Sequence, residues 1–77
     1  MNLWEYCGKH VKITVDEGQS FTGRADLYTS ALDNPNGVET LSIWQDDSKD
    51  TLIEFEIHEI AYIEILSDNP VVIAEAI

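Results

Sequence analysis

Residues 11–31, VKITVDEGQSFTGRADLYTSA, constrain the fold more than any other part of this chain. Apolar and polar residues alternate in VKITVD, and this period of two is typical of a β-strand with one buried face. The turn DEGQ follows, in which Gly18 is free to adopt a positive φ. A second alternating run then carries Gly23 in its middle. Because a glycine weakens a strand unless it permits a bend or a close backbone approach, this pattern predicts a long strand that curls into a barrel.

Alternation and turn residues divide the rest of the chain into a short helix and further strands. The predicted fold is an all-β, five-stranded, bent-sheet barrel with a short amino-terminal helix. The helix begins after Asn2, which can cap it, and presents Leu3, Tyr6 and Cys7 to the sheet. The five predicted strands cover residues 10–16, 20–31, 38–44, 51–56 and 61–66. The residues expected on the buried face of the second strand are Phe21, Gly23, Ala25 and Leu27.

A chain of 77 residues is short for a stable isolated domain. We predict one barrel domain over residues 1–66 and an apolar tail over residues 67–77 that packs on the barrel or on a neighbouring subunit. Cys7 is the only cysteine, so no internal disulfide can form. Oligomerisation is then the remaining common source of stability.

Acidic residues outnumber basic ones, and the excess lies in the second half of the chain. Residues 32–77 contain one lysine and eleven Asp or Glu residues, and the whole chain has a formal net charge of −11. Phosphate binding relies on clustered Lys and Arg, so this composition disfavours contact with nucleic acid. The acids either keep a small protein in solution or face a basic protein partner.

The glycine and strand pattern resembles the Sm-like (LSm) family over about residues 3–66. Gly8, the first strand, the turn at Gly18 and the triplet Phe21-Thr22-Gly23 are similar to the first Sm motif. The resemblance implies an RNA-facing loop over residues 28–34 and a homo-oligomeric ring. SH3-like domains, which are also small five-stranded barrels, share much of this pattern.

The second Sm motif departs from the family pattern. Where the family carries an Arg-Gly or Lys-His pair between its last two strands, this chain has Glu56 and Ile57, and His58 is the only potential cation there. Two functions follow as hypotheses. One is an Sm-like, ring-forming scaffold associated with RNA, and the other is a protein-interaction or assembly module that kept the ring and lost RNA binding.

Candidate RNA- or partner-binding residues lie in the loop and beside the second motif. They are Tyr28, Asp33, Asn34 and His58. Tyr28 falls on the polar phase of the second strand just before the loop, so it either lines the loop surface or has a structural role.

The fourth and fifth strands are the expected edges of the sheet. Exposed edges favour aggregation, and pairing the fourth strand of one copy with the fifth strand of the next satisfies both. The expected oligomer interface comprises Ile53, Phe55, Ile63 and Ile65.

No residue pattern predicts catalysis, a metal site or a cofactor. Cys7, His10 and His58 are one ligand short of the usual structural zinc site. We expect Cys7 to be buried, and burial raises the pKa of a thiol and so opposes nucleophilic catalysis. No membrane-spanning run or signal segment is recognisable from Met1 onwards, so a cytoplasmic location without a membrane partner is expected.

Overall fold

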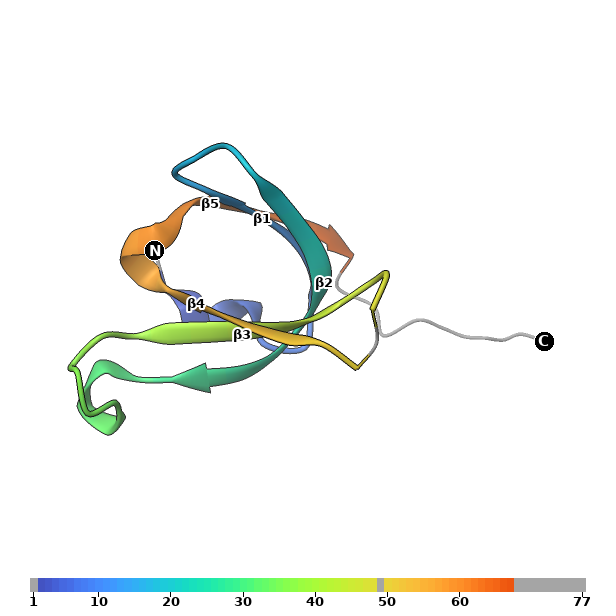
Figure 1. Ribbon diagram of the computed structural model, residues 1–77. Helices are drawn as coiled ribbons and strands as arrows, with labels where there is room; N and C mark the ends of the chain where they lie inside the picture. Colours follow the sequence, from blue (N-terminus) through green and yellow to red (C-terminus); the bar gives the residue numbers. More distant parts are fainter. Residues whose placement is uncertain (1, 49, 68–77) are drawn as a thin grey trace.

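The computed structural model describes residues 2–48 and 50–67 as a curled antiparallel sheet (Figure 1). The strands are β1 (His10–Val15), β2 (Ser20–Thr29), β3 (Thr40–Gln45), β4 (Leu52–Glu56) and β5 (Ile60–Ser67), and their order in the sheet is β4-β3-β2-β1-β5. The predicted five strands are confirmed within one or two residues at each end. In the described residues no ladder joins β4 to β5, so the sheet is curled but not closed.

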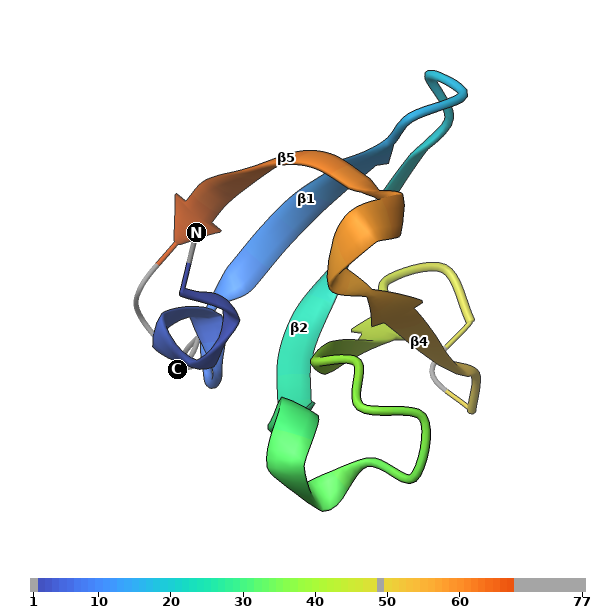
Figure 2. The same cartoon turned by 90° about the vertical axis from the view of Figure 1, so that its left-hand side faces the viewer.

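The described residues contain three short 3-10 turns, one before β1 and two in connections between strands. They are η1 (Leu3–Tyr6), η2 (Ala31–Asp33) and η3 (Ile57–Glu59). Figure 2 shows η3 between β5 and β4. No helix in residues 2–48 and 50–67 has the length and hydropathy to span a membrane. Except for Ser67, which ends β5, the predicted tail lies outside the described residues.

The amino-terminal segment is a single 3-10 turn, not the α-helical turn that the sequence predicts. The Asn2 side chain does not cap it and instead donates to Glu5 Oε2 at 3.4 Å. Leu3 is fully buried and Tyr6 packs against the core, because residues three apart are eclipsed in a 3-10 turn. Cys7, one position further, points away and is exposed, so its predicted burial is wrong.

The hydrophobic core lies on the inside of the curled sheet. Each strand and the amino-terminal turn contribute to it. Its buried members are Leu3, Val11, Ile13, Ala25, Leu41, Ile43, Phe55 and Ile60.

An irregularity in β2 reverses the predicted faces beyond Ala25. Ala25 pairs with Ile43 on β3, and Leu27 pairs with Ser42, which is adjacent to Ile43. Asp26 is therefore an extra residue in β2. A one-residue bulge of this kind moves the following side chains to the opposite faces. Leu27 is consequently 54% exposed, contrary to prediction, and Tyr28 packs against the core.

Gly23 allows the backbones of β2 and β3 to come into close contact. A Cβ atom at this position would lie 2.0 Å from the carbonyl oxygen and 2.8 Å from the carbonyl carbon of Trp44. Both atoms belong to the backbone and cannot rotate away. Of the two expected reasons for a glycine here, a bend or a close backbone approach, the structure shows the close approach.

We predict that Gly23→Ala lowers the free energy of unfolding by about 2–3 kcal/mol, because the added methyl group must displace the backbone of β3. In a domain of this size the melting temperature falls by about 10 °C or more, measured by circular dichroism. Arg24→Ala, at the exposed neighbouring position, is the control and changes stability by less than about 0.5 kcal/mol. Equal melting temperatures for the two variants would contradict the steric argument.

Candidate functional site

The two edges of the sheet are β4 and β5, as predicted. The four proposed interface residues lie on these strands and face inwards. Phe55 is a core residue, Ile53 and Ile63 are half-buried, and Ile65 is 45% exposed. The sequence analysis did not identify Leu52 and Tyr62, which are 41% and 56% exposed on the outer face of the same edges. Alternation along β4 and β5 places both on this face and could have revealed them.

The backbone of β4 offers hydrogen-bonding groups on its free side. The Ile57 N–H donates to the Glu39 carbonyl at 2.9 Å, and the Gln45 N–H donates to the Thr51 carbonyl at 3.2 Å. In an antiparallel ladder, residue pairs that exchange backbone hydrogen bonds alternate with pairs that do not. Thr51 and Ile57 both bond towards β3, so the odd-numbered residues between them face β3 and the even-numbered ones do not. The N–H and C=O groups of Glu54 therefore point away from β3, towards the open edge.

Glu56 connects the β2–β3 loop to η3. Its Oε2 accepts a hydrogen bond from Asn36 Nδ2 at 3.0 Å, and its Oε1 lies 3.2 Å from His58 Nε2. Its backbone N–H donates to Glu59 Oε1 at 2.9 Å and forms part of a capping box. An anion thus occupies the position where the Sm-like resemblance implies a cation, and it already contacts the only nearby His.

The predicted loop residues serve mainly to shape the loop. Ser30 Oγ accepts from the Asp33 N–H at 3.3 Å and donates to Asp33 Oδ2 at 3.1 Å. Asn34 Nδ2 donates to the Val38 carbonyl at 2.9 Å. Among the described residues, no hydrogen bond or ion pair joins His58 to Asp33 or Asn34. The loop reaches η3 through Asn36 instead, a residue that the sequence analysis did not identify.

Tyr28 is half-buried against the core, and its hydroxyl donates to Glu39 Oε2 at 2.5 Å. This hydrogen bond, followed by desolvation and the Glu39 charge, raises the pKa of Tyr28 to about 12. The hydroxyl is therefore occupied within the fold, which favours the structural role over a ligand-facing one.

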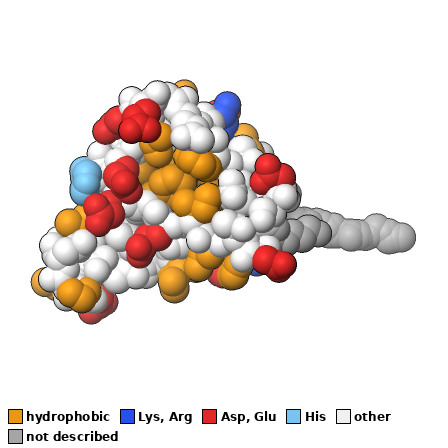
Figure 3. Space-filling model, in the orientation of Figure 1, with side chains coloured by type: hydrophobic (Ala, Val, Ile, Leu, Met, Phe, Trp, Pro, Cys, Tyr) orange, Lys and Arg blue, Asp and Glu red, His pale blue; other side chains and the backbone are white. Residues whose placement is uncertain are grey.

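One end of the curled sheet opens into a groove of about 430 Å³. Its apolar floor comprises Val15, Phe21, Ile53 and Phe55, and the rings of Phe21 and Phe55 lie 5.3 Å apart. Four carboxylates, a histidine and a glutamine complete its lining, namely Asp16, Glu17, Glu54, Glu59, His58 and Gln19. Figure 3 shows apolar side chains at the centre of this face and acidic side chains around them.

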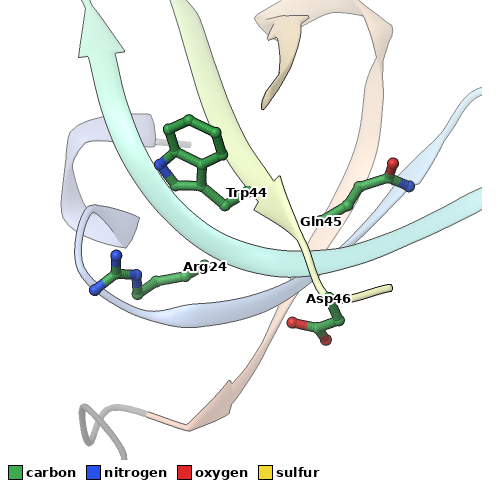
Figure 4. A pocket seen from close by; sticks show the side chains of 4 residues that line it. All are labelled: Arg24, Trp44, Gln45 and Asp46. Carbon is green, nitrogen blue, oxygen red and sulfur yellow. The ribbon is translucent and has the colours of Figure 1, made fainter. Parts of the chain in front are cut away.

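A second hollow of about 590 Å³ is lined by Arg24, Trp44, Gln45 and Asp46 (Figure 4). Trp44 Nε1 donates to Asp26 Oδ2 at 2.7 Å, and His10 Nε2 lies 2.6 Å from Asp46 Oδ2. These bonds tie the bulge of β2 to β3, and β1 to the β3–β4 loop. The polar contacts around this hollow therefore hold neighbouring strands together.

Cys7, His10 and His58, which the sequence analysis considered as zinc ligands, do not form a common site in the described residues. Although the Cys7 side chain is exposed, some desolvation of its thiol and the nearby Asp26 carboxylate raise its pKa, so the thiol stays protonated at neutral pH. Within residues 2–48 and 50–67, no three His, Cys, Asp or Glu side chains are grouped so as to hold a metal ion. His10 and His58 contact Asp46 and Glu56, respectively, on different connections of the sheet.

No family model, curated protein or solved structure matches this chain. The site must therefore be interpreted from its own residues, contacts and charges.

We predict that Glu39→Gln lowers the pKa of Tyr28, because the tyrosinate would no longer face a carboxylate. In the wild-type protein the phenol stays largely protonated at about pH 11, whereas an ordinary tyrosine with a pKa near 10 is ionised there. NMR of ¹³Cζ-labelled tyrosine measures the change, with Tyr28→Phe to assign the signal and circular dichroism at the same pH to verify folding. An unchanged Tyr28 titration in Glu39→Gln would contradict the assigned cause.

Proposed function

We propose that this chain is a non-enzymatic assembly module with an Sm-like barrel architecture, whose copies associate head to tail through β4 and β5. The observation that carries the proposal is the strand order, which leaves these two strands as free edges. The assembled module binds a protein partner in preference to RNA.

The edges have the properties that such an association requires. Glu54 directs a backbone donor and acceptor towards the free side of β4, and free groups of this kind pair with another strand. Leu52 on β4 and Tyr62 on β5 share the outer face, so pairing of the two edges would bring exposed apolar side chains together. A head-to-tail contact of this type closes into a ring or extends as a filament.

The surface near the β2–β3 loop favours a protein over RNA. Glu39, Glu56 and Glu59 lie on or beside this loop and η3, and His58 contacts Glu56. A phosphate group approaching η3 would meet carboxylates, because η3 contains no lysine or arginine to bind it. RNA association is the second candidate function. The hydrogen bond between Asn36 and Glu56 supports it, because it joins the β2–β3 loop to η3, the two connections that the Sm-like resemblance assigns to RNA.

We predict that the wild-type chain forms an oligomer at micromolar concentration and that Glu54→Pro dissociates it. Proline removes the outward N–H of Glu54 but leaves the β3–β4 ladder bonds, which involve the neighbouring positions. Size-exclusion chromatography with light scattering measures the mass. Glu54→Gln is the matched control, since it keeps the N–H and removes the charge.

An oligomer that persists unchanged in Glu54→Pro would contradict association through β4, provided that circular dichroism shows the variant folded. A wild-type monomer at micromolar concentration would contradict the assembly proposal as a whole.

We predict weak binding of labelled poly-U and poly-A RNA, with dissociation constants above about 100 µM, even at low salt where phosphate contacts are strongest. The net charge of −11 and the carboxylates around η3 are the reason. Fluorescence anisotropy measures the affinity. Tighter binding that weakens steeply with salt would support the RNA-associated scaffold instead.

A further inference from the structure

The groove at the open end of the sheet combines an apolar floor with three carboxylates that have no side-chain partner among the described residues. In residues 2–48 and 50–67, no side-chain hydrogen bond or ion pair engages the carboxylates of Asp16, Glu17 or Glu54. Glu59, the fourth rim acid, accepts from the Glu56 N–H. Three of the four rim carboxylates are therefore available to a ligand.

Segments distant in the sequence form the two sides of this groove. Val15, Asp16 and Glu17 come from the β1–β2 hairpin, and Glu54 and Phe55 come from β4. The floor continues into the hydrophobic core through Phe55, which is 4% exposed, and through the half-buried Phe21. An apolar side chain inserted here would extend the existing core.

We propose that the groove binds an extended segment of a partner protein in which basic and apolar residues alternate. Successive side chains of an extended peptide point to opposite sides, so the apolar ones can enter the floor while the basic ones reach the rim. The rim attracts Lys and Arg and repels acidic segments and polyphosphates. This inference rests on the proposed protein-binding function and specifies the partner's chemistry.

Charge argues against a second copy of this chain as the occupant. The exposed edge strand β5 carries Glu64 and no Lys or Arg, and the chain as a whole has a net charge of −11. A copy placed in the groove would bring like charges towards Asp16 and Glu17, which lie on the β1–β2 hairpin and not on the edge strands used for assembly. A basic segment of another protein removes this repulsion.

The test uses a fluorescein-labelled peptide of alternating arginine and leucine and measures binding to the full chain by fluorescence anisotropy. Two control peptides replace either every arginine by glutamate or every leucine by serine. The Arg-Leu peptide is expected to bind more tightly than both controls. Raising the salt from about 50 to about 300 mM is expected to weaken its binding, because the rim charges are exposed.

A rim variant with Asp16→Asn, Glu17→Gln and Glu54→Gln is expected to bind the Arg-Leu peptide about tenfold more weakly, since three charge contacts are removed. The matched control carries Glu5→Gln, Asp47→Asn and Asp50→Asn, three exposed acids that do not line the groove. Its affinity stays within about twofold of wild type, because such distant surface charges contribute little.

Three outcomes would overturn the proposal. These are an equal loss of binding in both triple variants, equal affinity for the Arg-Leu and Arg-Ser peptides, and displacement of the peptide by poly-U RNA. Light scattering on the same samples separates this test from the assembly test. Glu54→Pro and Glu54→Gln both lack the rim carboxylate, so equal peptide affinities in the two variants, with only Glu54→Pro dissociated, support both proposals. A rim variant that dissociates shows that a second copy fills the groove and overturns this one.

Discussion

The close contact between the backbones of β2 and β3 is the constraint on which the rest of the structure depends. Gly23 lies against the Trp44 carbonyl, where any side chain would overlap the neighbouring strand. This approach, together with the bulge after Ala25, lets the sheet curl around its core. Ladders link β4 to β5 through β3, β2 and β1, but within residues 2–48 and 50–67 no ladder pairs β4 directly with β5. The same curl that encloses the core therefore leaves two edges and an open end.

The open edge and the open end offer different chemistry. Along β4, backbone groups at Glu54 and the exposed Leu52 favour pairing with another strand. At the open end, the apolar floor around Phe21 and Phe55 lies among carboxylates that have no partner in the described fold. The two surfaces share residues 53–55 of β4, whereas Asp16 and Glu17 of the groove lie on the β1–β2 hairpin, away from the edge strands.

The connections of the sheet are held by side chains that the Sm-like resemblance would assign to a ligand. Glu56 joins Asn36 to η3 and contacts His58, and Tyr28 bonds Glu39 within the same region. Each of these groups has its hydrogen-bonding capacity at least partly used inside the chain. The negative charges of Glu39 and Glu56 remain, and they are the main physical difference between this surface and one suited to phosphate.

The sequence by itself determined the five strands and the turns between them, because local alternation and turn residues specify these features. The prediction of β4 and β5 as edges followed from the expected bent five-stranded sheet, and the observed strand order confirms it. Only the tertiary structure decided which side chains face the core after Ala25, where the bulge turned Leu27 outwards and Tyr28 inwards. It also decided that Cys7 is exposed, and that Asp16 and Glu54 share one groove. Bulges, tight turns and the meeting of distant segments depend on pairing across strands, which no local pattern encodes.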